Sequence, residues 1–373
     1  MRIGIVLNYK NAEKKKDELL NIKSKKMSWL KHANKKKYKK HIINKKFIPA
    51  DVAIGIFIET HYPEVKVDYI SPDDISTRRF KKNDLNFVII YDLLESFHLS
   101  DKSKFEKYKL ALKNSNNVYP PYDYQKFINN KCMYYKYLAD KKIPVAPTYC
   151  ITKEKWYSRN PDKYISNLIT KFKSNKWSSI IAKPVYGQES IDFAKFTSCP
   201  LKKDSLLCKK NKMMKYFGRT IPKYKSMVIQ EYIPGFDKDN PEIRTYFING
   251  KYMYSIVTTS KRVGAPIQEG GTFKIPDKNF NYIKRLAKRV MKSLPKLDLP
   301  GNLKNPILTR IDIGSGLEGV PMTYFVNEVE FVPSLYIEEL DPIKTPVIDR
   351  ISKTLVKVAE EYSVRKLPIK TKF

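Results

Sequence analysis

The sequence is short of acidic residues and has no long apolar run. Of its 373 residues only 38 are Asp or Glu, against 72 Lys or Arg, so its formal net charge is +34. No apolar run approaches the roughly 20 residues that cross a bilayer, so we expect no membrane-spanning helix. The N-terminal stretch "MRIGIVLNYKN" lacks the longer apolar region and the small-residue cleavage site of a secretory signal. These absences favour a cytoplasmic protein that does not enter the membrane.

Cysteine is also scarce, and its spacing argues against the usual zinc sites. The four cysteines are Cys132, Cys150, Cys199 and Cys208, and no two of them form a CxxC pair. Zinc sites that contain cysteine usually have such pairs. In a cytoplasmic protein thiols are kept reduced. The simplest prediction is therefore four free cysteines and no zinc site.

The excess of lysine allows two interpretations. A positive field of this size attracts polyanions such as nucleic acid, nucleotides or acidic lipid. The densest run is "KHANKKKYKKHIINKK", residues 31–46, which is predicted to be a helix or a mobile loop. However, Asn, Ile and Tyr are also abundant, as AT-rich codons would produce, and charge runs are usually solvated surface. The sequence leaves open whether this surface binds nucleic acid.

A chain of this length usually folds as more than one subdomain, and its first third predicts a small parallel α/β layer. The expected strands are Arg2–Leu7, Val65–Ile70 and Asn86–Asp92. Residues 51–62 carry apolar side chains at helical spacing, although three isoleucines also alternate as in a strand. We favour the helix. The Pro120-Pro121 pair predicts the end of this unit.

The remaining two thirds predict alternating helices and strands and one antiparallel hairpin. The expected elements are a helix and a strand in "NNKCMYYKYLADKKIPVAPTYCI", a strand in "WSSIIAKPVYG", a partly helical segment at residues 202–225, a strand in "MVIQEYIPG", a helix in "NFNYIKRLAKRVMKSL" and two strands between residues 309 and 333. The hairpin lies in "EIRTYFINGKYMYSIVT". Its Asn249-Gly250 pair separates two aromatic and β-branched runs, which is typical of a type I′ turn.

The last two strands carry acids in otherwise apolar sequence. In "TRIDIG", Arg310 and Asp312 lie two residues apart and therefore share a face of the strand. The same spacing in "FVNEVEFVP" predicts one face with Val326, Glu328 and Glu330 and an opposite face with Phe325, Asn327, Val329 and Phe331. Pairing of the two strands would place Asp312 beside Glu328.

Two glutamates on one face repel each other, and burial of either is costly unless cations compensate. Three hard oxygen ligands close together suit Mg²⁺, which proteins hold by one or two carboxylates and the phosphates of a substrate. The alternative is an exposed strand edge with ordinary surface acids, in which Arg310 forms an ion pair.

Motifs upstream favour the metal site. In "IIAKPVYGQES", Lys183 ends a very apolar strand and can reach a phosphate, while Gly187 and Ser190 allow backbone amides to approach it. In "VIQEYIPG", a polar pair follows an apolar strand, and such a backbone can bind the edge of an adenine. Glu242 and Arg244 share a face of the first hairpin strand. Each of these signals is weak alone.

Together and in this order, the segments resemble the ATP-grasp superfamily. "RIGIVL … VKVDYI … NFVIIYD" is similar to the family's pre-ATP-grasp domain, and "NKCMYYKYLADKKIPVAPTYCI" to its lysine-bearing helix and following strand. "IIAKPVYGQES" resembles the strand-lysine-proline motif with its glycine loop, and "VIQEYIPGFDKDNPEIRTYFINGK" the hinge strand and Glu-x-Arg hairpin. "TRIDIG" and "FVNEVEFVP" resemble the two metal-ligand strands.

The resemblance implies a fold and a division of the chain. The expected class is α/β (α+β), with the ATP-grasp fold. An N-terminal pre-ATP-grasp α/β domain would cover residues 1–119. A central nucleotide-binding subdomain would cover residues 120–234, and a C-terminal catalytic subdomain residues 235–373.

The resemblance also implies a role for each motif residue. The phosphates of ATP would be bound by Lys131, Lys183, Gly187 and Ser190. The adenine would be lined by Glu231, Tyr232 and Ile233, and the ribose hydroxyls held by Glu242. Arg310, with Lys183, would stabilise the transferring phosphoryl group and the acyl intermediate. Asp312 and Glu328 would be the principal Mg²⁺ ligands.

One position departs from the family pattern. The second metal-ligand glutamate of the family is usually followed two residues later by Asn, and here that position is Glu330. An acid there is predicted to be a third metal ligand or a close neighbour of the ligands, or else to alter which metal or substrate is preferred. Mn²⁺ is therefore an alternative to Mg²⁺. Asn327 is predicted to lie on the wrong face to substitute.

The resemblance implies an ATP-dependent ligase that phosphorylates a carboxylate and joins it to an amine, both from small-molecule substrates. This chemistry needs charge neutralisation at the γ-phosphoryl group more than a protein nucleophile, which fits the lack of a Ser/His/Asp or Cys/His arrangement. The candidates for substrate contact are Arg244, Lys261 and Arg262. Two alternatives stay open: a phosphotransferase for an inositol-phosphate-like anion, and an inactive protein of this fold that binds nucleic acid. The sequence indicates no oligomeric state.

Overall fold

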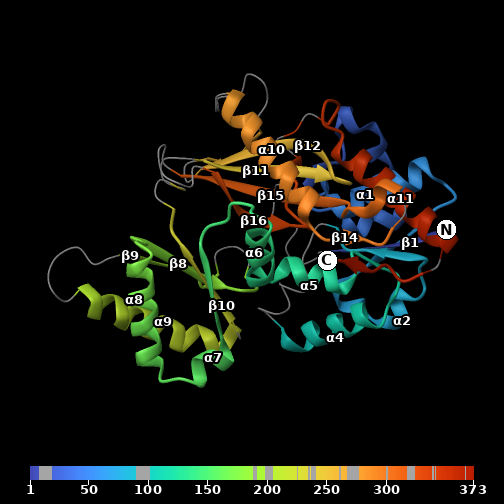
Figure 1. The fold of residues 1–373 in the computed structure, drawn as a ribbon. Coiled ribbons are helices and arrows are strands. Elements are labelled where there is room, and N and C mark those ends of the chain that lie inside the picture. Colours follow the sequence, from blue (N-terminus) through green and yellow to red (C-terminus); the bar gives the residue numbers. More distant parts are fainter. Residues whose placement is uncertain are drawn as a thin grey trace.

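The computed structural model contains three larger β-sheets and two short two-stranded ones (Figure 1). It describes residues 1–7, 19–89, 101–187, 191–197, 205–224, 226–233, 236, 241–259, 262–266, 277–299, 301–316, 324–337, 340, 342–365 and 367–373. The three larger sheets follow one another along the chain, and the candidate site lies between the second and the third.

The first sheet is the parallel α/β layer that the sequence predicts. Its strands, in the order β4-β1-β5-β6, are β4 (Lys66–Ile70), β1 (Arg2–Val6), β5 (Leu85–Phe87) and β6 (Val118–Tyr119), and all its pairs are parallel. Strand β5 is shorter than the predicted Asn86–Asp92, whose last three residues lie outside the described ones. The bond between Tyr119 and Pro120 is cis, which shapes the exit from this layer.

Residues 51–62 form a helix, as predicted, because both sides of this segment are covered. Helix α1 (Ala50–His61) is buried at every residue from Ala50 to Ile58. It contacts β1 and β4 and also the C-terminal helix α11 (Val347–Arg365). A helix buried on both sides needs apolar residues all round. This explains why the sequence of α1 also shows a strand-like alternation. The other helices of this part are η4 (Pro72–Asp74), α2 (Thr77–Phe80) and α4 (Lys102–Lys113).

The lysine-rich run forms two 3₁₀ helices that pack on α1. They are η2 (Lys25–Asn34) and η3 (Lys36–His41), flanked by the paired strands β2 (Leu19–Asn21) and β3 (Phe47–Pro49). The Trp29 ring meets the Phe57 ring edge-on, with centroids 5.2 Å apart. The hydroxyl of Tyr38 donates to Glu59 of α1. These contacts fix the segment, and its lysines point outward.

The second sheet forms the lower left lobe in Figure 1. Its strand order is β7-β10-β8-β9, with only antiparallel pairs. The strands are β7 (Thr148–Thr152), β8 (Ser179–Pro184), β9 (Ala194–Thr197) and β10 (Ser226–Glu231), and the helices are α7 (Lys153–Tyr157), α8 (Pro161–Ser174) and α9 (Ser205–Tyr224). One face of the sheet packs on these helices through residues such as Ile151, Ala182 and Met227. The opposite face turns toward α6 (Lys131–Asp140), which follows α5 (Tyr122–Asn129).

The third sheet is five-stranded and has the order β13-β12-β11-β15-β16. Its strands are β11 (Glu242–Ile248), β12 (Lys251–Thr259), β13 (Arg262–Pro266), β15 (Leu308–Ser315) and β16 (Tyr324–Glu330). The β11–β12 turn confirms the predicted hairpin, since Asn249 has φ 49° and Gly250 has φ 74°. Helix α10 (Asp277–Ser293) contacts β11 and β15. The remaining elements are β14 (Lys296–Leu297), η5 (Gly301–Lys304) and β17 (Thr371–Lys372).

The prediction of four free cysteines is wrong for two of them. Cys132 of α6 and Cys150 of β7 form a disulfide, with their Cα atoms 6.1 Å apart. The sequence spacing of 18 residues gives no sign of this bond, because only the packing of α6 against β7 brings the two cysteines together. Cys199 and the side chain of Cys208 lie outside the described residues.

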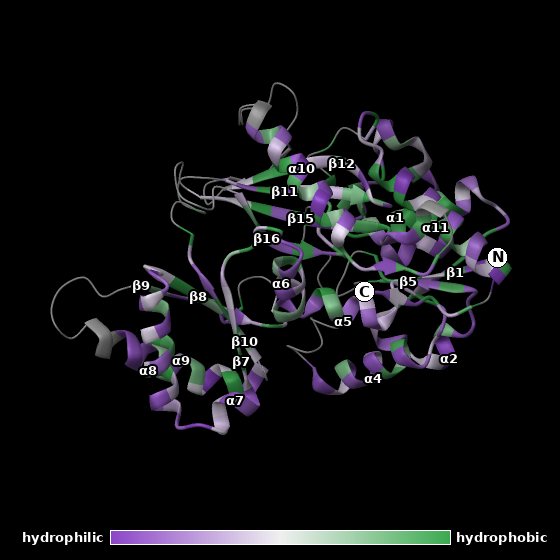
Figure 2. Cartoon of the chain, in the orientation of Figure 1, coloured by the Kyte–Doolittle hydropathy of each residue, from purple (hydrophilic) through white to green (hydrophobic). Residues whose placement is uncertain are grey.

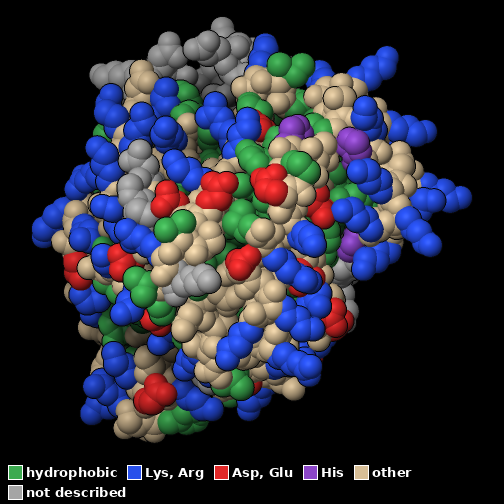
Figure 3. All heavy atoms as spheres, turned by 90° about the vertical axis from the view of Figure 1, so that its right-hand side faces the viewer, with side chains coloured by type: hydrophobic (Ala, Val, Ile, Leu, Met, Phe, Trp, Pro, Cys, Tyr) green, Lys and Arg blue, Asp and Glu red, His purple; other side chains and the backbone are tan. Residues whose placement is uncertain are grey.

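Hydrophobic residues concentrate in the strands and in the helices between the layers, and hydrophilic residues on the outward sides of the helices (Figure 2). Figure 3 shows the face that carries the N-terminal layer, where Lys and Arg side chains are spread widely and Asp and Glu side chains are fewer. In the described part of the chain, no helix combines the length and the apolar character that crossing a bilayer requires.

Candidate active site

One face of the five-stranded sheet carries the predicted catalytic residues in neighbouring rows. Residues directly opposite each other on adjacent strands point to the same face. The register gives the rows Tyr246–Arg310–Glu330 and Arg244–Asp312–Glu328 and, beyond a bulge, the pair Gly314–Phe325. Glu242 lies two residues beyond Arg244 on the same face. Successive rows are separated by about 7 Å along the strands, so the face offers an ordered series of positions to an elongated ligand.

The predicted pairing of Asp312 with Glu328 is confirmed. Glu328 and Glu330 lie half-buried on the edge strand β16, whereas the residues of β15 opposite them are buried. Asp312 is 1% exposed and Arg310 is 5% exposed. The Arg310 guanidinium donates from Nε and Nη2 to the two oxygens of Asp312, both at 2.8 Å, and from Nη2 to Glu330 at 2.7 Å. One oxygen from each of Asp312, Glu328 and Glu330 lies within 4.8 Å of the others. The structure therefore brings together the three predicted metal ligands.

The surroundings shift the ionisation of these acids in opposite directions. Burial raises the pKa of Asp312, although the adjacent Arg310 favours its charged form. Burial by itself would also raise the pKa of Glu328. The positive charges of Lys131 and Lys183 outweigh this effect, so the pKa of Glu328 is lowered. Binding of a divalent cation stabilises the charged form of such a carboxylate, because the cation offsets both the cost of burial and the repulsion of the two neighbouring acids. The donor set of three carboxylates suits a hard ion such as Mg²⁺ or Mn²⁺.

Two lysines reach this cluster from the second lobe. Lys131, at the first turn of α6, lies with its Nζ 3.2 Å from a Glu328 oxygen and donates to the Gly187 carbonyl at 2.9 Å. Lys183, at the end of β8, donates to the Tyr135 hydroxyl at 3.2 Å. Asn130 begins α6, and its side chain accepts from the Met133 N–H. The predicted phosphate ligands Lys131, Lys183 and Gly187 thus lie together, whereas Ser190 lies outside the described residues.

An apolar cluster lies at the Gly314–Phe325 end of the rows, where the resemblance places the adenine. Ala146, Ile233, Phe236 and Phe325 form one buried cluster. Gly314 makes room for the two rings, because a Cβ at this position would lie 2.5 Å from Phe325 and 2.8 Å from Phe236. The Phe236 and Phe325 rings pack edge-to-face with centroids 5.2 Å apart, and aromatic side chains of this kind suit contact with a purine.

The hinge backbone of residues 231–233 adjoins this apolar cluster. The N–H of Glu231 donates to the Pro147 carbonyl and that of Tyr232 to the Ser179 carbonyl, both at 3.0 Å. No described residue accepts a hydrogen bond from the N–H of Ile233. Burial raises the pKa of the Glu231 side chain. The Tyr232 ring has the Lys195 ammonium 3.2 Å from its centroid.

The predicted faces of β16 are wrong for the residues that precede Glu328. The register shifts between Asp312 and Ile313, so that Val326 pairs with Ile313 and Phe325 with Gly314. Such a bulge inserts one residue and reverses the alternation. Phe325 therefore joins the site face. Asn327 is also not on the wrong face, because its Nδ2 donates to a Glu242 oxygen at 2.5 Å.

Glu242 is held in place by its neighbours. Besides Asn327, it accepts from the Nε of Arg244 at 3.0 Å. The Arg244 guanidinium also donates to the Tyr336 hydroxyl, at 2.5 Å. The structure places Arg244, predicted to contact the substrate, on β11 in the charged row beside Asp312. Of the other predicted substrate residues, Arg262 is described only by its backbone in β13, and Lys261 lies outside the described residues.

Sequence reasoning missed several contributors to the site. Tyr135 bridges the lobes, since it accepts from Lys183 and donates from its hydroxyl to the Asn327 carbonyl. Tyr336 bonds Arg244, and Asn327 bonds Glu242. The sequence contains one signal that the alternation of β16 is broken. Phe325 and Val326 are two consecutive apolar residues.

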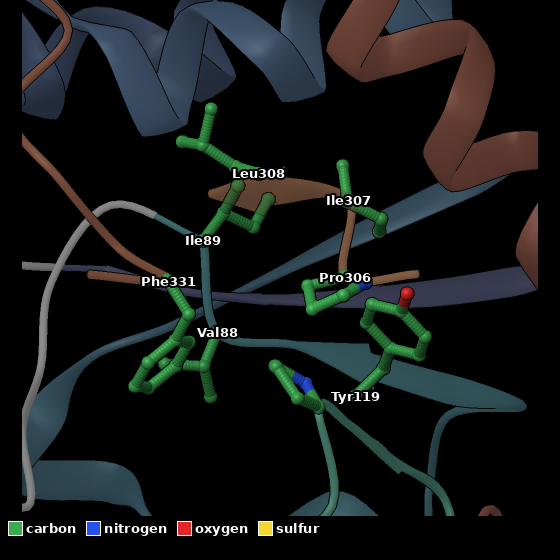
Figure 4. Close-up of a pocket in the computed structure, with 8 residues that line it drawn as sticks. Val88, Ile89, Tyr119, Pro306, Ile307, Leu308 and Phe331 are labelled. Atoms are coloured by element: carbon green, nitrogen blue, oxygen red, sulfur yellow. The ribbon is translucent and has the colours of Figure 1, made fainter. Parts of the chain in front are cut away.

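A separate apolar cavity lies where β15 approaches the N-terminal layer, and it is not part of the site (Figure 4). Its lining consists of Val88, Ile89, Tyr119, Pro120, Pro306, Ile307, Leu308 and Phe331. Its one polar side-chain group, the Tyr119 hydroxyl, already donates to the Asn305 carbonyl at 2.7 Å. The cavity has no group that would orient a ligand.

Comparison with solved structures agrees with the motifs. No protein-family model and no curated protein matches the sequence. The structure is similar to that of D-alanyl-alanine synthetase A from Vibrio cholerae, with a TM-score of 0.60, 14% identity and 98% of each chain covered. It is similar to D-cycloserine synthetase DcsG, with a TM-score of 0.58 and 13% identity over 96% of this chain and all of the other.

A third match is D-alanine–D-alanine ligase from Bacillus anthracis in complex with ATP, with a TM-score of 0.55 and 13% identity over 98% of this chain and 99% of the other. At these identities the likeness concerns the fold. The matches cover nearly the whole length of each chain, including the two sheets between which the candidate site lies. The chain has the ATP-grasp fold.

Proposed function

We propose that this protein is an ATP-dependent ligase that activates a carboxylate as an acyl phosphate and joins it to an amine. The observation that carries the proposal is the cluster of buried Asp312 and half-buried Glu328 and Glu330 on one sheet, met by Lys131 and Lys183 from residues 120–234. ATP would lie between the subdomains of residues 120–234 and 235–373. Proteins of similar structure are described as D-alanine–D-alanine ligase and D-cycloserine synthetase, which supports a ligase.

The charges of the site suit ATP with divalent cations. Among the residues that the structure describes, the linked charged groups of the site are four acids and four cations, namely Glu242, Asp312, Glu328, Glu330, Lys131, Lys183, Arg244 and Arg310. ATP with two divalent cations is close to neutral, so its binding would preserve this balance. An unpaired buried charge is costly, and a balanced site avoids that cost both with and without the nucleotide.

The order of the rows suggests how ATP would lie. Ile233, Phe236 and Phe325 would hold the adenine, and Glu242 would accept from the ribose hydroxyls. The phosphates would then run toward the middle row, where Lys131 and Lys183 neutralise their charge. Mg²⁺, if held by Asp312, Glu328 and Glu330, would supply further neutralisation at the β- and γ-phosphates.

In the reaction, a carboxylate oxygen of the substrate attacks the γ-phosphorus, and the bond to the bridging oxygen breaks to release ADP. The amine nitrogen then attacks the acyl carbon, phosphate leaves and the nitrogen loses a proton. Arg310 lies in the row next to Asp312 and Glu328, opposite Glu330, where its fork would face the transferred phosphoryl group. The protein's contribution is positioning and charge neutralisation, for which no protein nucleophile is required.

Product analysis tests the reaction type. Incubation of the protein with ATP and pools of amino acids and other carboxylates should yield ADP, phosphate and a new amide, detected by mass spectrometry. ADP together with a phosphorylated alcohol would instead identify a phosphotransferase. ATP left intact with every pool would contradict both.

Lys183→Ala should weaken MgATP binding by about tenfold to a hundredfold, because it removes a charge-assisted hydrogen bond to a phosphate. Titration calorimetry with MgATP measures this effect. Lys173→Ala is the matched control, since Lys173 is exposed on α8 of the same lobe. Equal affinities of the Lys183 variant and the unmodified protein would remove Lys183 from the nucleotide site.

A second candidate function is non-specific binding of nucleic acid, favoured by one surface. Residues 22–50 contain eleven lysines and no acid. All eleven are exposed, and they lie in or beside η2 and η3, of which η2 packs on α1. A fixed surface of this kind can contact several phosphates at once. None of the site residues belongs to it, so this binding would be independent of catalysis.

Replacing four of these lysines with Gln should weaken binding of a short DNA duplex and flatten its salt dependence. The chosen positions are Lys35, Lys36, Lys39 and Lys40. Each lost phosphate contact should lower the slope of log K against log salt by about 0.9, as measured by fluorescence anisotropy. ATP turnover should not change.

The matched control replaces four exposed lysines of α7 and α8, namely Lys153, Lys155, Lys163 and Lys173. If this control variant lost as much DNA affinity as the first, the charge would act as a diffuse field and the surface of η2 and η3 would not be a site. Sequence-specific or salt-insensitive binding would contradict the electrostatic account altogether.

A further inference from the structure

The Cys132–Cys150 disulfide joins the two elements that carry the lysines of the candidate site. Cys132 directly follows Lys131 at the start of α6. Cys150 of β7 lies opposite Val228 of β10, and Val228 lies opposite Lys183 of β8. Residues opposite each other on adjacent strands share a face. Cys150 and Lys183 therefore point to the same side of the sheet, the side on which α6 packs.

The other contacts between α6 and this sheet are long or depend on flexible side chains. The backbone N–H of Lys131 donates to the Val185 carbonyl at 3.4 Å. Lys183 reaches the Tyr135 hydroxyl at 3.2 Å through its long side chain. Within the part of the chain that the structure describes, the disulfide is the one covalent cross-link. It therefore restrains the first turn of α6 more firmly than these hydrogen bonds do.

Helix α6 is also attached to the five-stranded sheet and its helix. Lys131 forms the ion pair with Glu328 at 3.2 Å, and Tyr135 donates to the Asn327 carbonyl. At the outer end, the Tyr137 hydroxyl donates to the Ser293 carbonyl at 2.9 Å. Because α6 lies between the lobes, a shift of its first turn relative to β7 changes the separation of Lys131 from Lys183.

We propose that the Cys132–Cys150 disulfide positions Lys131 against Lys183, so that the oxidised protein binds MgATP more tightly than the reduced protein. This inference rests on the proposed function, since it takes both lysines to bind the phosphates. A cross-link that fixes the two lysines before the nucleotide arrives removes part of the ordering cost of binding. Cys132 and Cys150 are positioning residues, and neither contacts the nucleotide itself.

The redox step is a thiol–disulfide exchange with a dithiol. One thiolate attacks a sulfur of the pair, the Cys132–Cys150 bond breaks, and a mixed disulfide forms. The second thiol of the reductant then closes a cyclic disulfide and leaves two protein thiols. Both cysteines are half-buried, so a small dithiol can reach them.

Titration calorimetry of the full chain with MgATP, before and after reduction by dithiothreitol, tests the inference. The dissociation constant should rise by about fivefold to tenfold on reduction. A second readout follows from linkage, because MgATP must then make reduction less favourable by the same factor. Equilibration in dithiol redox buffers with and without MgATP, read by thiol alkylation and mass spectrometry, measures that factor.

Variants separate the bond from the cysteines themselves. Cys132→Ser, Cys150→Ser and the double variant break the same bond, so their effects on MgATP affinity should be equal rather than additive. Cys208→Ser is the matched control, which should retain both the affinity and the response to dithiothreitol. Thermal unfolding monitors folding, and reduction of the unmodified protein gives the same test without a substitution.

The outcomes are distinguishable. Equal affinities of the oxidised and reduced protein, tighter binding after reduction, or additive effects of the two cysteine variants would overturn the inference. Failure of both forms to bind MgATP would instead refute the proposed function.

Discussion

Glu328→Ala should reduce Mg²⁺-dependent ATP turnover by on the order of a thousandfold. Glu328 lies opposite Asp312 and within ligand distance of it, so its loss leaves a divalent cation with too few protein ligands near the phosphates. The variant should also lose the increase in nucleotide affinity that Mg²⁺ produces. Turnover is measured by ADP release, and affinity by calorimetry with and without Mg²⁺.

Two further variants make this result specific. Glu328→Gln retains the size of the side chain and a hydrogen-bond acceptor for Lys131, which is 5% exposed, but it lacks the charge. It should lose turnover as the alanine variant does while the protein stays folded. Glu330→Asn restores the residue that the family usually has and should keep Mg²⁺-dependent turnover. Glu360→Ala, at an exposed position of α11, is the matched control. Unchanged turnover in both Glu328 variants would exclude this metal site.

The core of the site could be predicted because it rests on short-range patterns. Spacing by two places Arg310 and Asp312 on one face of their strand, and it places Glu328 and Glu330 on one face of theirs. The pairing of the two strands follows from their order in the chain. The Asn249-Gly250 turn likewise fixes the hairpin within a few residues. Local patterns of this kind do not depend on tertiary contacts with the rest of the chain.

The parts that could not be predicted depend on tertiary contacts. The bulge between Asp312 and Ile313 reverses the faces of β16, and the bonding of Asn327 to Glu242 follows from it. No rule of alternation indicates where a register will shift. The Cys132–Cys150 bond exists because α6 packs across the sheet edge at β7, which sequence spacing cannot show.

Helix α1 illustrates how tertiary burial decides between two local patterns. Its apolar residues fit a helix and partly fit a strand, and the helix forms because one segment must be buried between the parallel sheet and α11. The same layering explains the lysine-rich run. Its few apolar residues, such as Leu30 and Ala33, are buried in η2, and they suffice to fix a segment that its composition alone leaves as helix or loop.

Arg310→Lys should lower kcat by about a hundredfold or more while changing MgATP affinity much less. The guanidinium donates to both oxygens of Asp312 and to Glu330, and these bonds hold it in place beside the candidate metal ligands. Lysine keeps the charge but has a single donor centre and cannot reproduce the planar fork. A donor that acts on the transferred phosphoryl group mainly stabilises the transition state, so its loss appears in kcat rather than in nucleotide binding.

Rapid-quench measurement of ADP formation, together with calorimetry, separates the two effects. Arg285→Lys is the matched control, since Arg285 is exposed on α10. A parallel fall in affinity and kcat would show that Arg310 acts mainly by holding Asp312 in place. Unchanged turnover would remove Arg310 from the chemistry and leave it as the counter-ion of two buried acids. A selective loss of kcat would show that the proposed phosphoryl transfer takes place at this row of the sheet.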